Sequence, residues 1–266
     1  MNVIEVRDLR RVYRRPRTAL TTPGTQVEAL RGVSFDLPTR TRFGVVGESG
    51  SGKSTLIRLL AALDKPTSGT ISFQGEDITG LPERRLKFLR RELQVVFQDP
   101  MGSLDPRMRV RDIICEPLVA QGHSDPAGRL TELLDAVGLP ERSADRYPHQ
   151  FSGGQRQRIS IARALAPNPS VLVADEPVSA LDVSVRAQIL NLLADLVERF
   201  SLTLVFVSHD LSVVRHVCDT VAVMRSGEIV EMGAAEEIYE APRHEYTREL
   251  IAAVPTLRTA LRRFSE

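Results

Sequence analysis

The sequence has little cysteine, no long apolar run and no excess of charge of either sign. Its two cysteines, Cys115 and Cys218, lie far apart among apolar neighbours. Neither a disulfide framework nor a thiolate metal site is therefore expected, and a reducing compartment fits. No apolar run approaches the roughly 18 residues that span a bilayer. Charged Glu5, Arg7 and Asp8 interrupt the stretch where a signal peptide would be apolar. We expect a soluble, cytoplasmic chain.

The charges are balanced, with 35 Lys and Arg against 34 Asp and Glu in 266 residues. The net charge of +1 gives no global argument for a nucleic-acid partner, and none is expected. Arginines gather in residues 10–17 and 84–91. Such runs are usually solvated faces, and contact with lipid head groups or a partner chain is the alternative. A hydrophobic content of 42% allows a large core in one domain, or in one domain with an inserted lobe.

A glycine-rich turn near residue 50 predicts a binding site for nucleotide phosphates. Gly47, Gly50 and Gly52 permit backbone angles at which consecutive N–H groups point at a phosphate. Lys53 supplies a mobile charge for the outer phosphates, and Ser54 offers a hydroxyl to Mg²⁺ at the start of a helix. The predicted ATP contacts in this turn are Gly47, Glu48, Ser49, Gly50, Ser51, Gly52, Lys53, Ser54 and Thr55.

The segments around this turn favour a functional P-loop over a chance match. The motif arises by chance in roughly one chain of this length in a hundred. Apolar residues at 43–46 predict a buried strand before it, and leucines at i, i+3, i+4 and i+7 predict the buried face of a helix after it. These leucines are Leu56, Leu59, Leu60 and Leu63. A P-loop alone does not decide among kinases, GTPases and transport ATPases.

An antiparallel sheet is expected near the N-terminus. Residues 3–9 alternate apolar and charged side chains, and residues 27–37 resume the pattern after a loop rich in Pro, Gly and Thr. Tyr13 lies where the first strand gives way to that loop. It is a candidate to stack on an adenine ring, and a partly buried core tyrosine is the alternative.

A buried strand at residues 93–98 ends at Gln98, because the proline two residues later forces the chain out of regular structure. A glutamine at a strand end is usually only a loop cap. The pattern then changes to helices, with probable pieces at 110–120 and 127–137, separated by Gly and Pro. Residues 99–165 are therefore expected to form an inserted helical lobe.

A second phosphate-binding helix start is predicted at Ser152, Gly153, Gly154 and Gln155, before a helix at about residues 156–166. The serine can cap that helix, and the glycines leave its first N–H groups bare. A simple turn is the alternative reading of these residues.

Two carboxylates follow the apolar strand at residues 170–174. Ligands of open α/β sheets bind at the carboxyl ends of the strands. Asp175 therefore suits the shell of a Mg²⁺ ion, and Glu176 suits a general base for water. A helix at 183–200 and a strand ending at Ser208 follow, so His209 also lies at a strand end.

Taken in order, these motifs resemble the nucleotide-binding subunit of ABC transporters over essentially the whole chain. The motifs are the P-loop, Gln98, Ser152 to Gln155, Asp175-Glu176, the run Ser179, Ala180, Leu181 and Asp182, and His209. The resemblance implies an α/β fold, with a P-loop NTPase core of ABC type, a mostly parallel sheet, a small N-terminal antiparallel subdomain and an inserted helical subdomain. It implies one ABC domain over 1–266. The core takes residues 1–98 and 166–240, the helical subdomain 99–165 and a tail 241–266.

The resemblance also implies a role for each motif. Tyr13 stacks on adenine, while Gln98 senses Mg²⁺ and the attacking water and links to the helical lobe. The Ser152 segment clamps the γ-phosphate held by a partner's P-loop, and the segment ending at Asp182 crosses the dimer interface. Glu176, His209 and Gln98 form the catalytic set. Ser54, Gln98 and Asp175 hold Mg²⁺, partly through water.

Residues 98–108 and 244–250 resemble the ATPases of dipeptide, oligopeptide and nickel importers. Phe151, Asp105 and Glu245 depart from that pattern, which puts the substrate class in doubt rather than the ATPase activity. The tail lacks the cysteine cluster of some members, so no iron-sulfur cluster is expected. Implied partners are a second, homologous ATPase subunit, two permeases and an extracytoplasmic binding protein. The chain would sit at the cytoplasmic face of the membrane, held by the permeases.

Other nucleotide-binding classes fit less well. A GTPase or nucleotide kinase shares only the P-loop, and the Asn-Lys-x-Asp motif that reads guanine is absent. ATPases of DNA repair and chromosome organisation carry a long coiled coil, for which the segment between Lys53 and Ser152 is too short. A soluble ABC-type ATPase without a permease is the remaining alternative.

Overall fold

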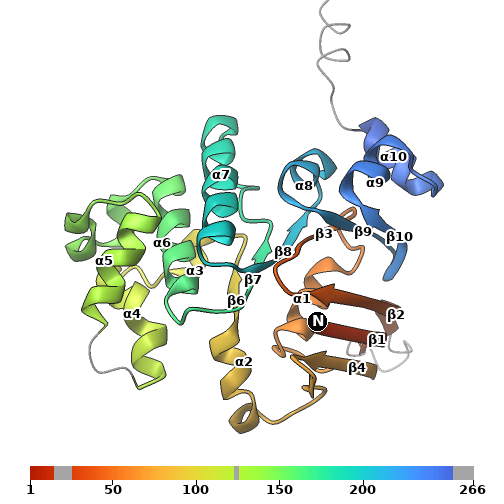
Figure 1. The fold of residues 1–266 in the computed structure, drawn as a ribbon, viewed down its shortest axis with the longest axis horizontal. Coiled ribbons are helices and arrows are strands. Elements are labelled where there is room, and N and C mark those ends of the chain that lie inside the picture. Colours follow the sequence, from red (N-terminus) through yellow and green to blue (C-terminus); the bar gives the residue numbers. More distant parts are fainter. Residues whose placement is uncertain (15–25, 123–125, 254–266) are drawn as a thin grey trace, which may run out of the picture. The chain divides into compact units, whose positions relative to one another are not determined.

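The computed structural model describes residues 1–14, 26–122 and 126–253 (Figure 1). The chain forms two compact units: unit 1 joins Met1–Gly80 to Phe206–Glu266, and unit 2 is Leu81–Val205. The loop predicted after Tyr13 and the end of the predicted tail lie outside the described residues. The predicted helical lobe falls within the bounds of unit 2, and its own boundaries stay a prediction.

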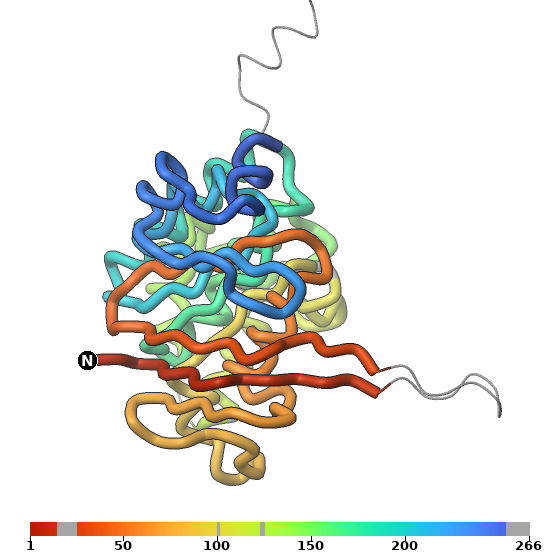
Figure 2. Tube along the Cα trace, turned by 90° about the vertical axis from the view of Figure 1, so that its right-hand side faces the viewer, coloured from red at the N-terminus to blue at the C-terminus, as the bar shows by residue number. Residues whose placement is uncertain are grey.

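Unit 1 contains the predicted antiparallel sheet, with the strand order β2-β1-β4-β5. Its strands are β1 (Asn2–Arg14), β2 (Gln26–Pro38), β4 (Ser68–Phe73) and β5 (Glu76–Asp77). Strands β1 and β2 run side by side (Figure 2) and are longer than predicted, since Tyr13 still pairs with Val27. Tyr13 therefore lies inside β1. The apolar side chains of Ile4, Val6 and Leu9 in β1 are buried, and the pairing register with β2 shifts between Val6 and Leu9.

The P-loop strand of unit 1 is β3 (Arg42–Val46), which pairs in parallel with β9 (Thr220–Arg225). Strand β10 (Glu228–Ala234) adds to β9 in the antiparallel sense. Helix α8 (Leu211–Val217) packs on β3, where a Cβ at Gly44 would lie 2.2 Å from Cγ1 of Val214. The glycine of this strand therefore lets the helix approach closely. Helices α9 (Ala235–Glu240) and α10 (Glu245–Ala253) complete the described part of the unit.

Helix α1 (Lys53–Leu60) begins directly after the P-loop and buries Leu56, Leu59 and Leu60 as predicted. The prediction that Leu63 belongs to the same buried face is wrong, because its side chain is 53% exposed. The helix ends at Leu60, and Ala62 adopts a left-handed φ of 48°. This turn carries the fourth leucine away from the helical repeat.

Unit 2 contains the parallel pair β6 (Leu93–Val96) and β7 (Val171–Asp175), whose residues from Val171 to Ala174 are buried. Strand β8 (Thr203–Ser208) is divided between the units, since unit 2 ends at Val205. Buried parallel strands read as continuous apolar runs. This is why the sequence predicted them closely, although β7 begins one residue later than expected and β6 ends at Val96, two residues before the predicted end at Gln98.

The helices of unit 2 are η1 (Glu83–Arg85), α2 (Lys87–Glu92), α3 (Pro100–Ser103), α4 (Val110–Ala120), α5 (Ala127–Ala136), η2 (Glu141–Asp145), η3 (Pro148–Gln150), α6 (Gly153–Leu165) and α7 (Val183–Arg199). The longer helices, α4, α5, α6 and α7, lie close to the predicted residues, whereas the short α3, η2 and η3 were not predicted. Helix α6 packs against α3, α4, α5 and α7, as Figure 1 shows. It begins at Gly153, three residues earlier than predicted, so the glycines are part of its first turn.

Both cysteines are buried with free thiols, and burial raises the pKa of each. Such thiols are unreactive, which fits a role in packing. Among the described helices, none combines the length and the apolar composition that a membrane span requires.

Candidate active site

The P-loop adopts the backbone geometry that its glycines predict. Gly47, Gly50 and Gly52 have φ values of 154°, 83° and 108°. A Cβ on Gly47 would lie 2.2 Å from the carbonyl oxygen of Met224, and one on Gly52 would lie 2.6 Å from that of Ala29. The loop is thus packed closely against neighbouring backbone, and a side chain at either position would displace it.

Lys53 is only 5% exposed, and its ammonium group lies over the loop. Its Nζ donates hydrogen bonds to the carbonyl oxygens of Gly47 at 2.6 Å and Glu48 at 2.9 Å. No side chain caps the start of α1, where Gly52 is the N-cap residue. A helix start without a side-chain cap, beside a buried cation, is suited to bind a phosphate. Ser54, the predicted Mg²⁺ ligand, is exposed on the first turn.

Tyr13 is held in place by Asp64 and Arg11. Its hydroxyl donates to Asp64 Oδ2 at 2.7 Å, and the Arg11 guanidinium carbon lies 4.5 Å from the ring centroid. The Arg11 guanidinium also donates two hydrogen bonds to the Asp64 carboxylate, from Nη2 to Oδ1 at 2.7 Å and from Nε to Oδ2 at 3.0 Å. Arg11 occupies one face of the ring, so a nucleobase would have to stack on the opposite face. Sequence reasoning missed both partners.

Asp64 should make the stability of unit 1 depend on pH. Burial raises the pKa of this carboxyl, but hydrogen bonds from Tyr13 and the Lys65 N–H, with the charge of Arg11, outweigh it and lower the pKa. Because the pKa of Asp64 is lower in the folded state than in the unfolded state, the charged carboxylate stabilises the fold at pH values above the unfolded-state pKa of about 4. This stabilisation is lost as the pH falls through the folded-state pKa.

We expect Asp64→Asn to lower the free energy of unfolding most near neutral pH. The difference from the unchanged chain should become progressively smaller as the pH falls below about 4. Urea unfolding across this range measures the difference between the two chains. Asp195→Asn, at an exposed position of α7, is the matched control for the loss of one carboxylate. A difference for Asp64→Asn that stays constant with pH would contradict the assignment.

In unit 2, Gln98 and Glu176 are brought together from the ends of neighbouring strands. Gln98 Nε2 lies 3.3 Å from Glu176 Oε2, as a donor to the carboxylate. Glu176 has a φ of 46°, which is unusual for a residue with a Cβ. Ser179 holds this turn, because its N–H and its hydroxyl both donate to the carbonyl oxygen of Glu176. Seven other non-glycine residues among those described also have a positive φ, so this value marks a tight turn.

Each unit carries oxygen donors of the kind that Mg²⁺ prefers. Unit 1 has the hydroxyl of Ser54, and unit 2 has the carboxylate of Asp175 and the amide oxygen of Gln98. The Gln98 contact with Glu176 uses its amide nitrogen, so the amide oxygen is the atom suited to a cation. Within the described residues, no group of three His, Cys, Asp or Glu side chains forms a metal site. Phosphate and water would supply the remaining ligands.

Ser152 forms the predicted cap at the start of α6, and Gln155 completes it. The Ser152 hydroxyl accepts the N–H of Gln155 at 3.3 Å, and the Gln155 side chain accepts the N–H of Ser152 at 3.0 Å. Gly154 has a further role, because a Cβ there would lie 2.4 Å from Cγ1 of Val185 on α7. Gly153 remains exposed beside this contact.

The remaining predicted residues lie on loops next to these elements. Leu181 is half-buried, 3.4 Å from where a Cβ on Gly153 would be, and its N–H donates to the Val178 carbonyl. Asp182 is the N-cap residue of α7. His209 is exposed directly after β8.

The predicted site residues are divided between the two units. Unit 1 carries Tyr13, the P-loop from Gly47 to Thr55, and His209. Unit 2 carries Gln98, Asp175-Glu176, and the segments 152–155 and 179–182. Each unit therefore contributes part of the predicted chemistry, and their roles toward a nucleotide are taken up below as proposals.

Two family models match this chain. One, described as ABC transporter, covers residues 30–179, and the other, described as oligopeptide/dipeptide transporter, C-terminal region, covers residues 230–266. The first spans more than half of the chain. The chain belongs to the ABC transporter family, among the ATP-binding subunits.

Curated proteins similar to this chain include ATP-binding proteins of peptide transport. The oligopeptide transport ATP-binding protein OppD of Mycobacterium bovis is 52% identical over 95% of this chain and 42% of that protein. The di/tripeptide transport ATP-binding protein DppF of Pseudomonas aeruginosa is 48% identical over 96% of this chain and 80% of that protein. The chain thus spans less than half the length of the mycobacterial relative.

Solved structures confirm the predicted fold class. The ATP-binding cassette MJ0796, in a dimeric post-hydrolysis state bound to ADP and Pi, has a TM-score of 0.76 and 31% identity, covering 87% of this chain and 98% of that one. The cbiO1 subunit of the cbiONQ transporter complex from Clostridium perfringens has a TM-score of 0.77 and 27% identity, covering 98% and 99%.

Proposed function

We propose that this chain binds and hydrolyses ATP as a subunit of an importer that takes up dipeptides or oligopeptides. The observation that carries the proposal is the Gln98–Glu176 hydrogen bond at two strand ends, beside Asp175. It is the arrangement expected for a base and a water-positioning amide. The names of the relatives and the match of residues 230–266 support peptides as the substrate class, with nickel as the second candidate.

Each unit would handle one part of the nucleotide. In unit 1, Tyr13 stacks on adenine, and Lys53 with the start of α1 binds the phosphates. Bound Mg²⁺ would neutralise phosphate charge. In unit 2, Glu176 accepts the proton of the attacking water. His209 holds that water against the γ-phosphate, and Gln98 orients it.

We propose that the active form is a dimer of this chain with a second, homologous ATPase subunit. The P-loop and the start of α6 are both suited to phosphate, and the related cassette MJ0796 is dimeric in its structure with ADP and Pi, which supports the proposal. Each chain would place its Ser152 segment on the ATP held by the other chain's Lys53, with the segment 179–182 at the interface. Both chains would be held at the cytoplasmic face of the membrane by two permeases, with an extracytoplasmic binding protein, and the lobe 99–165 would dock on the permease.

ATP should therefore act as part of the dimer interface. We expect a Glu176→Gln chain, mixed with its partner subunit, to sediment as a dimer with ATP and as monomers with ADP, because ATP bound by two chains stabilises their complex. Glu198→Gln, at an exposed position of α7, is the matched control and should not trap the dimer.

Monomeric behaviour of the mixture with ATP would contradict the dimer proposal, as would full hydrolysis by a single chain that stays monomeric. A soluble ABC-type ATPase without a permease is the alternative function. Copurification with membrane fractions that contain the permeases separates the two, because the alternative predicts no association.

A further inference from the structure

Tyr246 links the C-terminal region to the P-loop. The residue lies on α10, is 2% exposed, and its hydroxyl accepts the backbone N–H of Glu48 at 3.0 Å. The Arg225 guanidinium carbon lies 4.7 Å from the centroid of its ring. This tyrosine is 198 residues beyond the loop that it contacts, and it lies within the segment matched by the peptide-transporter C-terminal model.

The hydrogen bond acts on a peptide group that also contacts Lys53. The N–H of Glu48 and the carbonyl of Gly47 belong to one planar unit, so the orientation of one fixes that of the other. The carbonyl accepts from Lys53 Nζ at 2.6 Å, while the N–H donates to Tyr246. Gly47 has the φ of 154° that only glycine adopts easily, so this peptide has other conformations available. The tyrosine hydroxyl selects one of them.

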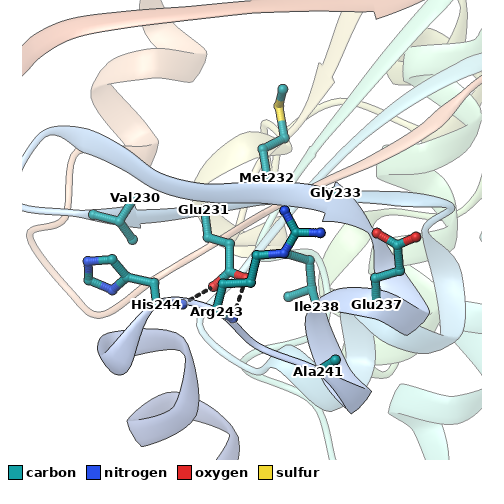
Figure 3. Close-up of a pocket in the computed structure, with 9 residues that line it drawn as sticks. All are labelled: Val230, Glu231, Met232, Gly233, Glu237, Ile238, Ala241, Arg243 and His244. Atoms are coloured by element: carbon teal, nitrogen blue, oxygen red, sulfur yellow. Dashed lines mark hydrogen bonds between the residues drawn. The ribbon is translucent and has the colours of Figure 1, made fainter.

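The start of α10 is fixed by a second set of hydrogen bonds, shown in part in Figure 3. His244 Nδ1 accepts the N–H of Tyr246 at 3.1 Å. The Glu231 carboxylate on β10 accepts the N–H groups of Arg243 at 2.8 Å and His244 at 3.0 Å. Burial raises the pKa of Glu231, but the Thr247 hydroxyl and the N–H groups of Arg243 and His244 outweigh it and lower the pKa, so the carboxylate stays charged. These hydrogen bonds hold the start of α10, and with it Tyr246, in position beside the P-loop.

We propose that Tyr246 is a positioning residue for nucleotide binding, through which the C-terminal region holds the Gly47–Glu48 peptide in its binding conformation. The inference rests on the proposed binding of ATP at the P-loop. Without the hydroxyl, the Glu48 N–H loses its partner and the peptide is free to turn. Nucleotide must then restore the loop as it binds, so affinity falls while the chemical step is unchanged.

Tyr246→Phe removes only the hydroxyl. We expect the KM for ATP in the assembled complex, and the Kd for ADP of the isolated chain, to rise about 2- to 10-fold, the usual effect of one hydrogen bond. The value of kcat at saturating ATP should stay within about twofold of the unchanged chain, because only uniform binding is lost. The melting temperature of each variant, without nucleotide, reports any effect on folding.

Tyr239→Phe is the matched control. This half-buried tyrosine lies on the neighbouring helix α9, with the Arg215 guanidinium 4.1 Å from its ring centroid. Within the described part of the chain it has no hydrogen bond to the P-loop, so its KM and Kd should not change. A Tyr246→Phe chain with a lower melting temperature and unchanged KM and Kd would overturn the inference. If the unchanged chain bound no ADP or ATP, the proposed function itself would be wrong.

Discussion

Glu176→Gln should lower ATP turnover in the assembled complex by about 10²- to 10⁴-fold, which is the usual contribution of a general base. Glutamine keeps the shape of the side chain and can still bond to Gln98, but it cannot accept a proton from water. ATP binding should survive, because the contacts of Lys53 and the P-loop are untouched. Phosphate release at saturating ATP measures the first effect, and equilibrium binding of ATP measures the second.

The left-handed turn at Glu176 should be the same in the Glu176→Gln variant and in the unchanged chain. Its φ of 46° and the two hydrogen bonds from Ser179 to its carbonyl depend on the backbone rather than on the carboxylate. The Gln variant should therefore keep this turn. Glu198→Gln controls for the loss of a charge on unit 2. Turnover at the unchanged rate in Glu176→Gln would rule out Glu176 as the base.

Lys53→Ala should weaken nucleotide binding itself, by about 10- to 100-fold, the effect of losing hydrogen bonds to a charged group. The side chain is buried over the loop, and its ammonium group is the positive charge at this phosphate site. Alanine removes the charge and also leaves the Gly47 and Glu48 carbonyl oxygens without this donor. Calorimetric titration with ADP and with ATP measures the affinity.

Lys87→Ala is the matched control, because this lysine is exposed at the start of α2. Its nucleotide affinity should equal that of the unchanged chain. An unchanged Kd in Lys53→Ala would show that the glycine-rich loop does not hold the phosphates. Lys53→Ala therefore tests nucleotide binding at the P-loop, and Glu176→Gln tests the hydrolysis step.

The parts predicted well from sequence are those encoded by local pattern. Buried parallel strands are continuous apolar runs, and α4 lies at the predicted residues 110–120. The glycines of the P-loop adopt the positive φ values that the motif requires. The error at Leu63 has a local cause as well. The apolar repeat continues past the end of the helix, and sequence periodicity does not reveal the left-handed turn at Ala62 that stops it.

The parts missed are contacts between residues far apart in the chain. Asp64 meets Tyr13 across 51 residues, and Tyr246 meets Glu48 across 198. No spacing rule connects such pairs, because only the tertiary structure brings them together. Arg11 left a weak signal, since it lies two residues before Tyr13 on one strand and thus on the same face. Gly154 was predicted for its bare N–H groups, while its contact with Val185 depends on how α6 and α7 pack.

That contact has a mechanical consequence. Gly154 lies in the first turn of α6 and Val185 in the first turn of α7, and no room remains between them for even one methyl group. The Ser152 segment precedes one helix, and the loop ending at Asp182 precedes the other. The two segments proposed to meet the partner chain therefore lie at the starts of two helices that are in direct contact. If these helices move as one body, the Ser152 segment and the loop ending at Asp182 would leave the partner chain together.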